Sequence, residues 1–571
     1  MHQLARVATS HVAVDQSNTS RATRREVIAS MDSLSVEIQL LILSFLPARA
    51  LCRVCQVNHV WRELAQDQQL WRSLYLRHYR EGDALDELPF GSASPQPSWK
   101  EVFKISRNWA NGSASSSALL SLRSAVLDAR LPIDLMLEGE PSRPSARATT
   151  QPEYEKPDTI VQLFGRLVFT ASRLDSVVNV WRTDPVSSLP ERLGAIVSPG
   201  LTGLSEHATV TEMRIDSAPR KNPRSLRLAV FFARGHFSIF TIQADTTLSY
   251  TESLFQSAPA HADSIALSRF HFPLLVTCST QLFLINFWRL AEDKEGLAAT
   301  LSRPSLRSSS SWSPAVLSLQ HLSPDREARP VDHSWPPKKR SPSYEPLPVG
   351  QDRFKVVLAF TTPYFAEWTL SVQEFVLSMT TSSDKVSIVS RHTTALPTSF
   401  SQIRHTSRSR TRARAAPLIS HIELALPWIV ASRNDNTIDV YSLADIDEQL
   451  VLLPRTQLFG HANAVTGVAV SADGKCVSGS FDGSYRLWDL TTTASRPIRI
   501  VAASEDRTED DVETIDSSSF QLASAGDLLK DSQSGAPPQN RIRSLAFDKE
   551  KIVGIRSLAT QSEDLQVLSF L

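Results

Sequence analysis

The chain has 571 residues, 42% of them hydrophobic and 21% charged, and its 60 Lys and Arg residues balance 60 Asp and Glu residues. This length allows several domains around a large core, and the neutral balance gives no reason to expect nucleic acid or a membrane surface as the main partner. No apolar run approaches the roughly 18 residues of a membrane-spanning helix. Four cysteines are too few for a disulfide framework, which favours a reducing compartment: the cytoplasm, the nucleus or both.

The first 30 residues lack an apolar core and a secretory signal, so we expect a disordered tail there. Residues 31–80 differ in character and are predicted to form a small all-α domain. An apolar stripe at helical spacing indicates its first helix, with Ser33 as N-cap and Pro47 after its end. The stripe consists of Leu34, Ile38, Leu41, Ile42 and Phe45. Two more helices are predicted from apolar residues at 51–61 and 64–71.

Cys52 and Cys55 form a CxxC pair within this domain. Such a pair suits redox chemistry or half of a zinc site, but no second Cys or His pair lies nearby in the sequence. We therefore predict two small apolar residues on one helix face, with no metal and no cofactor.

The stretch from Leu34 to Leu74 resembles an F-box without gaps, although Ser35 stands where the family usually has Pro. The matching positions are Leu34, Glu37, Ile38, Leu40, Ile42, Phe45, Leu46, Leu51, Val57, Trp61, Leu70 and Trp71. Pro at the first helical turn preorganises the backbone without adding contact chemistry, so its replacement weakens the match little.

The resemblance implies that an apolar helix face binds the Skp adaptor of SCF-type cullin-RING ubiquitin ligases, and through it the cullin and RING subunits. The residues expected to contact the adaptor are Leu34, Ile38, Leu41, Ile42, Phe45, Leu46, Val57, Trp61, Leu70 and Trp71. The alternative is an ordinary three-helix subdomain that packs these residues against its own chain.

Residues 81–157 are predicted to be a linker that contains one helix at 99–109. In F-box proteins with propellers, a helix that ends in Asn-Trp and Gly links the F-box to the first blade. Asn108, Trp109 and Gly112 match that pattern.

From residue 158 to residue 571, β-strand patterns repeat, and the clearest unit is Leu458–Leu490. It predicts strands at 465–471, 476–480 and 485–488, the last two joined by an Asp-Gly turn. The order of Gly-His, strand, Asp-Gly turn, strand and Trp-Asp resembles the WD repeat of β-propellers. The resemblance implies a buried hydrogen-bonded set, whose candidates are His461, Ser478, Ser480, Asp482 and Trp488. A catalytic His-Asp-Ser group is the alternative, but a network that locks one blade is favoured because each repeat would carry its own copy.

Six weaker copies accompany this unit, so the fold class is an all-α F-box domain followed by an all-β propeller, seven-bladed and of the WD-repeat type. Six or eight blades are the alternatives. The weaker copies lie at 160–181, 207–242, 261–288, 315–376, 418–441 and 541–570.

The last unit has three predicted strands, so an N-terminal strand must complete it and close the ring; residues 131–137 are the candidate. Interruptions near 291–353, 380–416 and 491–540 are rich in Ser, Pro and charge, and are predicted to be long loops that leave the propeller.

Four functions were weighed. The first is a substrate receptor of an SCF-type ligase, non-catalytic, whose propeller binds a target protein; the sequence leaves open whether the target is phosphorylated. The second is a non-degradative scaffold whose F-box-like helices pack internally or bind another partner. An enzyme is disfavoured because no P-loop, GxSxG or HExxH motif is present. Nucleic-acid binding through the basic runs at 338–340 and 404–414 is disfavoured because no aromatic residues interleave with them and an acidic run at 505–513 offsets them.

Overall fold

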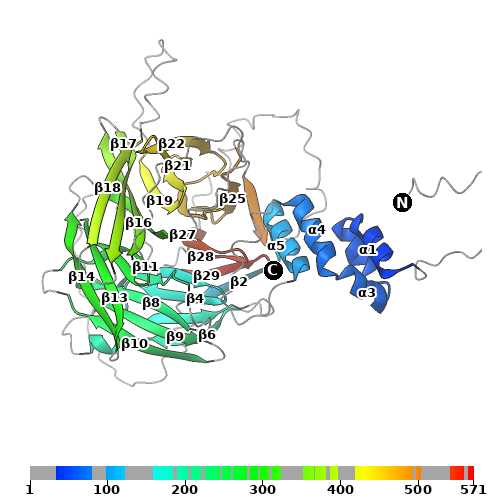
Figure 1. The fold of residues 1–571 in the computed structure, drawn as a ribbon, viewed down its shortest axis with the longest axis horizontal. Helices are drawn as coiled ribbons and strands as arrows, with labels where there is room; N and C mark the ends of the chain where they lie inside the picture. The colour runs from blue at the N-terminus through cyan, green and yellow to red at the C-terminus, as the bar shows by residue number, and fades with distance from the viewer. Residues whose placement is uncertain are drawn as a thin grey trace, which may run out of the picture. The chain divides into compact units, whose positions relative to one another are not determined.

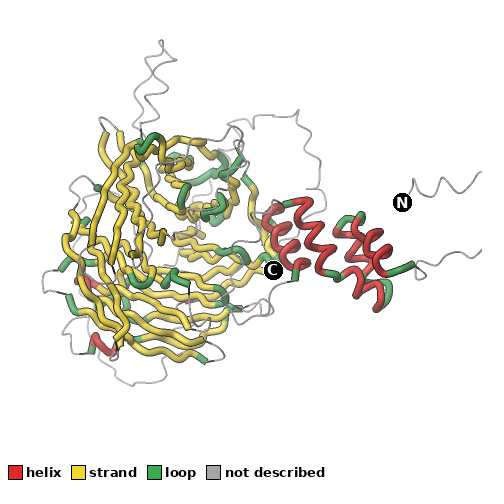
Figure 2. Tube along the Cα trace, in the orientation of Figure 1, coloured by secondary structure: helices red, strands yellow, loops and turns green. Residues whose placement is uncertain are grey.

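The part of the chain that the structure, a computed structural model, describes comprises residues 34–79, 98–122, 159–183, 189–202, 208–219, 225–244, 247–258, 262–279, 283–293, 296–307, 311–322, 351–364, 367–380, 386–395, 418–492, 497–502, 540–558 and 563–571. The chain divides into two compact units, 1–79 and 80–571. Helices make up the first unit and strands most of the second, as Figure 2 shows. No helix within the described ranges has both the length and the apolar character needed to cross a membrane.

The first unit contains four helices, α1 (Val36–Ser44), α2 (Ala48–Val54), α3 (His59–Ala65) and α4 (Gln68–His78). The expected second helix is divided in two because the side chain of Asn58 accepts a hydrogen bond from the amide of Trp61 at 2.8 Å and starts α3. Asp67 starts α4 in the same way, through the amide of Gln69 at 2.8 Å. These short polar caps set the boundaries that apolar spacing alone did not predict.

The second unit opens with helix α5 (Trp99–Asn111), which is fixed at both ends. At its start the Ser98 hydroxyl accepts a hydrogen bond from the Glu101 amide at 3.3 Å, and the Glu101 carboxylate accepts one from the Ser98 amide at 2.7 Å. At its end Gly112 has φ of +63°, and a Cβ there would lie 2.5 Å from the carbonyl oxygen of Arg499. Glycine is therefore needed at this turn.

The described residues of this unit form seven sheets, each built on consecutive antiparallel strands (Figure 1). Blade 1 contains β3 (Thr159–Phe164), β4 (Leu167–Ser172), β5 (Val178–Arg182) and β6 (Glu191–Ile196). Blade 2 contains β7 (Val210–Ile215), β8 (Ser225–Phe232), β9 (Phe237–Ala244) and β10 (Leu248–Gln256). Blade 3 contains β11 (Ile265–His271), β12 (Leu274–Ser279), β13 (Leu284–Asp293) and β14 (Gly296–Arg307). Blade 4 contains β15 (Trp312–Leu322), β16 (Gln351–Tyr364), β17 (Glu367–Thr380) and β18 (Val386–Thr394).

The last three blades repeat the arrangement. Blade 5 contains β19 (Ile419–Ala425), β20 (Trp428–Arg433), β21 (Ile438–Ile446) and β22 (Gln449–Leu458). Blade 6 contains β23 (Val465–Val470), β24 (Lys475–Ser480), β25 (Tyr485–Asp489) and β26 (Ile498–Ala502), with β1 (Ser113–Ala114) as a short fifth strand. Blade 7 contains β27 (Asn540–Phe547), β28 (Lys551–Leu558) and β29 (Glu563–Ser569), with β2 (Ser116–Ser121) at its edge.

The sheets close into a ring, because the first strands of successive blades contact one another in cyclic order. β3 contacts β7, and the series continues through β11, β15, β19, β23 and β27 back to β3. The prediction of a seven-bladed propeller is confirmed.

An apolar layer fills each of the seven spaces between neighbouring blades. Phe169 of blade 1 packs in one cluster with Phe232 of blade 2, for example, and Cys476 of blade 6 packs in another with Val430 of blade 5. Successive side chains of a strand point to opposite faces, so each sheet contributes to the two layers on either side of it. Burial of both faces explains why the inner strands are nearly continuous apolar runs.

The three predicted long loops are wrong in extent, because each contains strands. The interval 291–353 contains β14 and β15, the interval 380–416 contains β18, and the interval 491–540 contains β26. Of these strands, β14 and β18 lie at the outer edges of their sheets, where polar and charged side chains meet water, whereas β26 lies between β25 and β1 and β15 is the first strand of its blade. Outer strands therefore have a loop-like composition.

An N-terminal strand completes blade 7, as expected, but it is β2 and not residues 131–137. β2 pairs antiparallel with β29, from Ser116 opposite Ser569 to Ser121 opposite Asp564. The turn at Gly112 feeds the chain directly to this edge, so the closing strand comes immediately after α5. Residues 131–137, like the predicted N-cap Ser33 and the predicted tail, lie outside the described ranges.

Candidate functional site

The first unit exposes a group of large apolar side chains. Ile38 and Leu41 of α1 are 46% and 59% exposed, Phe45 after it is 72% exposed, and Val57 before α3 is 67% exposed. Exposed apolar side chains in such a group mark a site that another surface covers. Leu34, Ile42, Leu46 and Trp61, also predicted to contact a partner, are half-buried around them.

The opposite side of α1 faces the interior of the helical unit. Leu43 is 2% exposed, and the buried Gln39 side chain donates a hydrogen bond to the carbonyl of Leu34 at 2.9 Å. α1 is therefore apolar on both sides, and its own unit covers one of them.

Leu70 and Trp71 of α4, which are also predicted to contact a partner, belong to the core of this unit in the structure. Their exposed fractions are 6% and 2%, and the Trp71 indole donates a hydrogen bond to the carbonyl of Ala65 at 2.8 Å. The cap at Asp67 directs this face of α4 inward, a feature that apolar spacing does not reveal. Leu70 and Trp71 hold the helices that display the exposed face.

The two cysteines of the CxxC pair lie in different surroundings, since Cys52 is exposed and Cys55 is buried. Both are free thiols. Among the described residues, no group of three or more His, Cys, Asp and Glu side chains is placed to hold a metal ion.

In blade 6 the structure brings three of the five predicted polar residues together. The Ser478 hydroxyl lies 2.6 Å from Nε2 of His461 and accepts a hydrogen bond from Nε1 of Trp488 at 2.8 Å. All three side chains are buried. Ser480 instead bonds the carbonyl of Asn463 at 3.4 Å, and Asp482 accepts the amide of Ser484 at 2.9 Å within its turn.

The electrostatics of this set favour a structural role. Burial lowers the pKa of His461 from 6.5 to about 4, with Arg486 acting in the same direction and Asp482 against it. Burial would raise the pKa of Asp482, but hydrogen bonds from Ser484 and Ser480 and the charge of His461 together lower it. Asp482 is thus engaged in its own turn instead of orienting the imidazole, and the hydroxyl of Ser478 is engaged by an indole. In a catalytic group the carboxylate would instead orient the imidazole, and the imidazole would activate a hydroxyl that is free to attack a substrate.

The Trp–hydroxyl bond recurs in two other blades, which sequence reasoning missed. The Trp181 indole donates to Thr170 at 2.8 Å in blade 1, and the Trp288 indole donates to Thr277 at 3.1 Å in blade 3. The strand register identifies the residues that replace this Trp elsewhere: Phe240, Phe375, Tyr441 and Leu568, opposite Leu228, Val356, Ile429 and Ile552. Apolar packing replaces the polar bond at Phe240, Phe375 and Leu568, which is why the signatures of their blades are weak, whereas the Tyr441 hydroxyl interacts with Arg433 and Asp439.

The end of α5 is anchored to blade 7. The Trp109 ring stacks on Phe570 with centroids 4.0 Å apart, and its indole donates a hydrogen bond to the carbonyl of Lys549 at 2.7 Å. The Asn108 side chain donates to the carbonyl of Phe570 at 2.9 Å. The Asn-Trp pair and Gly112 thus fix the entry of the chain into its last two blades.

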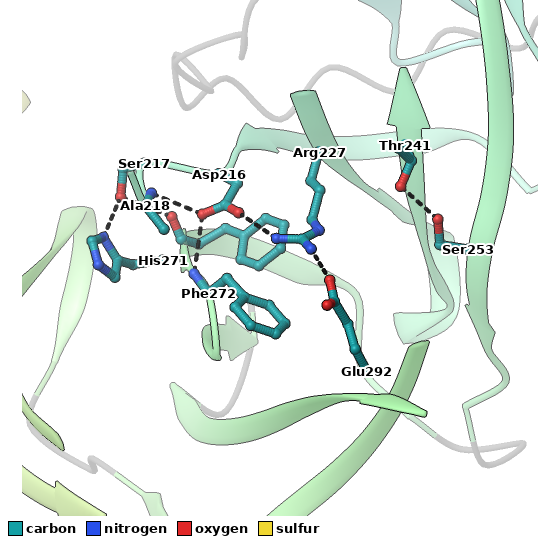
Figure 3. A network of polar contacts seen from close by, with 10 residues as sticks. Asp216, Ser217, Ala218, Arg227, Thr241, Ser253, His271, Phe272 and Glu292 are labelled. Atoms are coloured by element: carbon teal, nitrogen blue, oxygen red, sulfur yellow. Dashed lines mark hydrogen bonds and ion pairs between the residues drawn. The ribbon is translucent and has the colours of Figure 1, made fainter. Parts of the chain in front are cut away.

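A second polar network joins blades 2 and 3 (Figure 3). The buried carboxylate of Asp216 accepts hydrogen bonds from the amides of Ala218 at 2.9 Å and Phe272 at 3.0 Å, and pairs with Arg227 at 3.4 Å. The Arg227 guanidinium also pairs with Glu292 and lies 4.4 Å from the centroid of the Phe272 ring. Backbone amides and a permanent cation satisfy this carboxylate, so the network is a structural joint.

Comparison with known proteins agrees with the two architectures. A family model described as F-box-like matches residues 32–77, and a model described as the F-box protein pof12 beta-propeller matches residues 353–571. This chain joins an F-box-like domain to a seven-bladed β-propeller. F-box domains generally bind the Skp adaptor within SCF complexes, and proteins that join an F-box to a WD-type propeller are generally non-catalytic adaptors.

Individual relatives match short segments of this chain. The human F-box only protein 4 is 37% identical over 68 residues, 12% of this chain and 18% of the relative. The F-box/WD repeat-containing protein pof1 of Schizosaccharomyces pombe is 49% identical over 45 residues, 8% of this chain and 7% of the relative. The small ribosomal subunit protein RACK1 of Caenorhabditis elegans is 41% identical over 71 residues, 12% of this chain and 22% of the relative. The matches thus span less than a quarter of each relative.

Proposed function

We propose that this chain is a substrate receptor of an SCF-type ubiquitin ligase. Its F-box unit binds the Skp adaptor, and through it the cullin and RING subunits, while its propeller binds a target protein. The observation that carries the proposal is the apolar face of the first unit, where Ile38, Leu41, Phe45 and Val57 are exposed. Burial of such a face in a partner's groove is favourable by about 25 cal/mol per Å² of apolar surface.

The proposed receptor acts by positioning its target, without chemistry of its own. The receptor holds a target near a ubiquitin-loaded enzyme bound elsewhere in the complex, which raises the effective concentration of target lysines at that enzyme. The receptor itself contributes no catalytic group. We also propose the cytoplasm, the nucleus or both as its location, which its four free cysteines support.

Affinity purification with an aspartate at the exposed face tests the adaptor interaction. Leu41→Asp and Phe45→Asp place a charge where apolar contact is expected, and both positions are mostly exposed, so the unit stays folded. We expect loss of the adaptor, cullin and RING subunits. Gln69→Asp is the matched control, because it adds the same charge at an exposed position near the start of α4 and leaves binding intact.

The same experiment separates the two halves of the proposal. Proteins that stay bound to Leu41→Asp are propeller ligands, and a phosphatase-treated sample shows whether their binding needs a phosphate group. Retention of the adaptor by both aspartate variants would refute the ligase function and leave the chain as a scaffold.

A further inference from the structure

Permanent charges and backbone groups make polar contacts across several blade junctions of this ring. Arg391 of blade 4 pairs with Asp445 of blade 5 at 2.7 Å. Arg556 of blade 7 donates a hydrogen bond to the carbonyl of Gly483 of blade 6 at 3.2 Å. Contacts of these kinds keep their strength across the physiological pH range, because arginine stays protonated.

The junction of blades 3 and 4 differs, because two imidazoles face each other across it. His271 ends β11 and His321 lies near the end of β15; their rings are stacked with centroids 5.4 Å apart and an interplanar angle of 10°. Both rings also contact Phe354 of β16, which is fully buried, at centroid distances of 5.9 and 5.0 Å. The stack thus belongs to the wall between two blades.

Titratable and charged groups surround the pair on each side. Nδ1 of His271 lies 3.0 Å from the Ser217 hydroxyl (Figure 3), and Nε2 of His321 lies 3.6 Å from a carboxylate oxygen of Asp352. The neighbouring charges are Asp216 after β7, its partner Arg227 on β8, and Asp352 and Arg353 on β16. The carboxylate of Asp216 is already satisfied by two amides and Arg227.

We propose that the His271–His321 stack is a pH-sensitive joint between blades 3 and 4, closed when at least one ring is neutral and loosened when acid charges both. Two parallel imidazolium rings at this separation repel each other, and a neutral ring can stack on a charged one. The remainder of the junction is an apolar layer around Phe287 and Phe375, in which the thiol of Cys278 stays neutral because burial raises its pKa to about 12.

The direction of the effect agrees with the surroundings of His271. Burial lowers its pKa below the ordinary value of 6.5, and the charge of His321 acts in the same direction, while Asp216 and Asp352 act against it. A base whose pKa is lower in the closed form takes up a proton on opening, so the closed joint is favoured above pH 6.5 and loses that preference as the pH falls below it.

Hydrogen exchange of the full chain tests this joint at about pH 7.5 and about pH 5.5, the range in which histidine changes charge. Each variant is compared with the parent at the same pH, which removes the intrinsic pH dependence of exchange. On acidification we expect the opening of β11 and β15 to become easier by up to about tenfold per pH unit for each proton bound. His321→Phe keeps a ring on His271 and removes the second charge, so the acid response of β11 should be smaller than in the parent, and only the part that comes from burial of His271 should remain.

His392→Phe is the matched control, because His392 lies on the outer strand of blade 4, away from this stack, against Phe360. It should keep the acid response of the parent. Thermal unfolding at about pH 7.5 confirms that each variant is folded. An equal acid response in the parent and in His321→Phe, or no acid response in the parent, would overturn the proposal; neither result bears on adaptor binding.

Discussion

Replacement of Trp109 by Ala should open the seam between blade 7 and the strand that completes it. Trp109 is 4% exposed, stacks on Phe570 and donates its indole hydrogen bond to Lys549. A buried Trp replaced by Ala costs about 3–5 kcal/mol, of which the stack contributes about 0.5–1.5 and the hydrogen bond about 1 kcal/mol. This free energy is lost only where α5 packs on blade 7, so local opening of β2 and β29 should precede unfolding of the ring.

The assay is native-state hydrogen exchange of the amides in β2 and β29, with urea unfolding of the same samples. Trp109→Phe is the control: it keeps a ring on Phe570 and removes the hydrogen bond to Lys549, so we expect a loss of about 1–2 kcal/mol. Adaptor binding should survive both changes. Slow exchange of β2 in Trp109→Ala, equal to that of the parent, would refute the view that α5 holds the closing strand.

Three further predictions concern the ring. Ser478→Ala leaves the Trp488 indole and the His461 imidazole without their shared partner, so the free energy of unfolding should fall by about 1–3 kcal/mol. Ser478→Thr keeps a hydroxyl and should retain most of that stability. An unchanged melting temperature in the alanine variant would contradict this prediction. Glu374→Gln removes the buried charge, 1% exposed, that pairs with Lys355 and with Arg391 at 2.5 Å, and should cost about 2–4 kcal/mol in urea unfolding, less than a fully buried pair because Arg391 remains partly in water. The loss should be smaller in a background that also carries Arg391→Met, where the pair with Lys355 is all that remains. Burial lowers the pKa of His461 from 6.5 to about 4 in the folded chain, so the unfolded chain binds more protons between these pH values. The free energy of unfolding should therefore fall by up to about 3 kcal/mol between pH 6.5 and pH 4. In pH-dependent unfolding measurements, His461→Phe should reduce this dependence of stability on pH.

The sequence was sufficient for those parts of the fold where local pattern and burial agree. Blade 6 has turn glycines, a buried Trp and alternating apolar strands, and its three predicted strands match β23, β24 and β25 closely. The α1 stripe was likewise visible, since Ile38, Leu41 and Phe45 are large apolar residues at helical spacing.

Features that depend on distant partners could not be predicted. Leu70 and Trp71 have the same apolar character as Leu41, and the direction of α4 decides that they are core residues. The closing strand β2 is Ser-rich and has one buried residue, Ala118, so its own composition does not predict a strand. Its pairing with β29 is what makes it one. Outer strands such as β14 and β18 were missed for the same reason, because an edge strand is defined by its neighbour more than by its own residues.

The pairing of β2 with β29 also fixes the order of events when this protein is synthesised. Ser117 and Gln566, which meet across that seam, are 449 positions apart. At about 5–20 residues per second, a ribosome needs roughly 20–90 s after β2 to produce its partner β29. During that interval the edge of β2 stays unpaired and open to chaperones or to wrong neighbours. Under the proposed function, the helical unit is made before this interval ends, so adaptor binding would precede closure of the propeller.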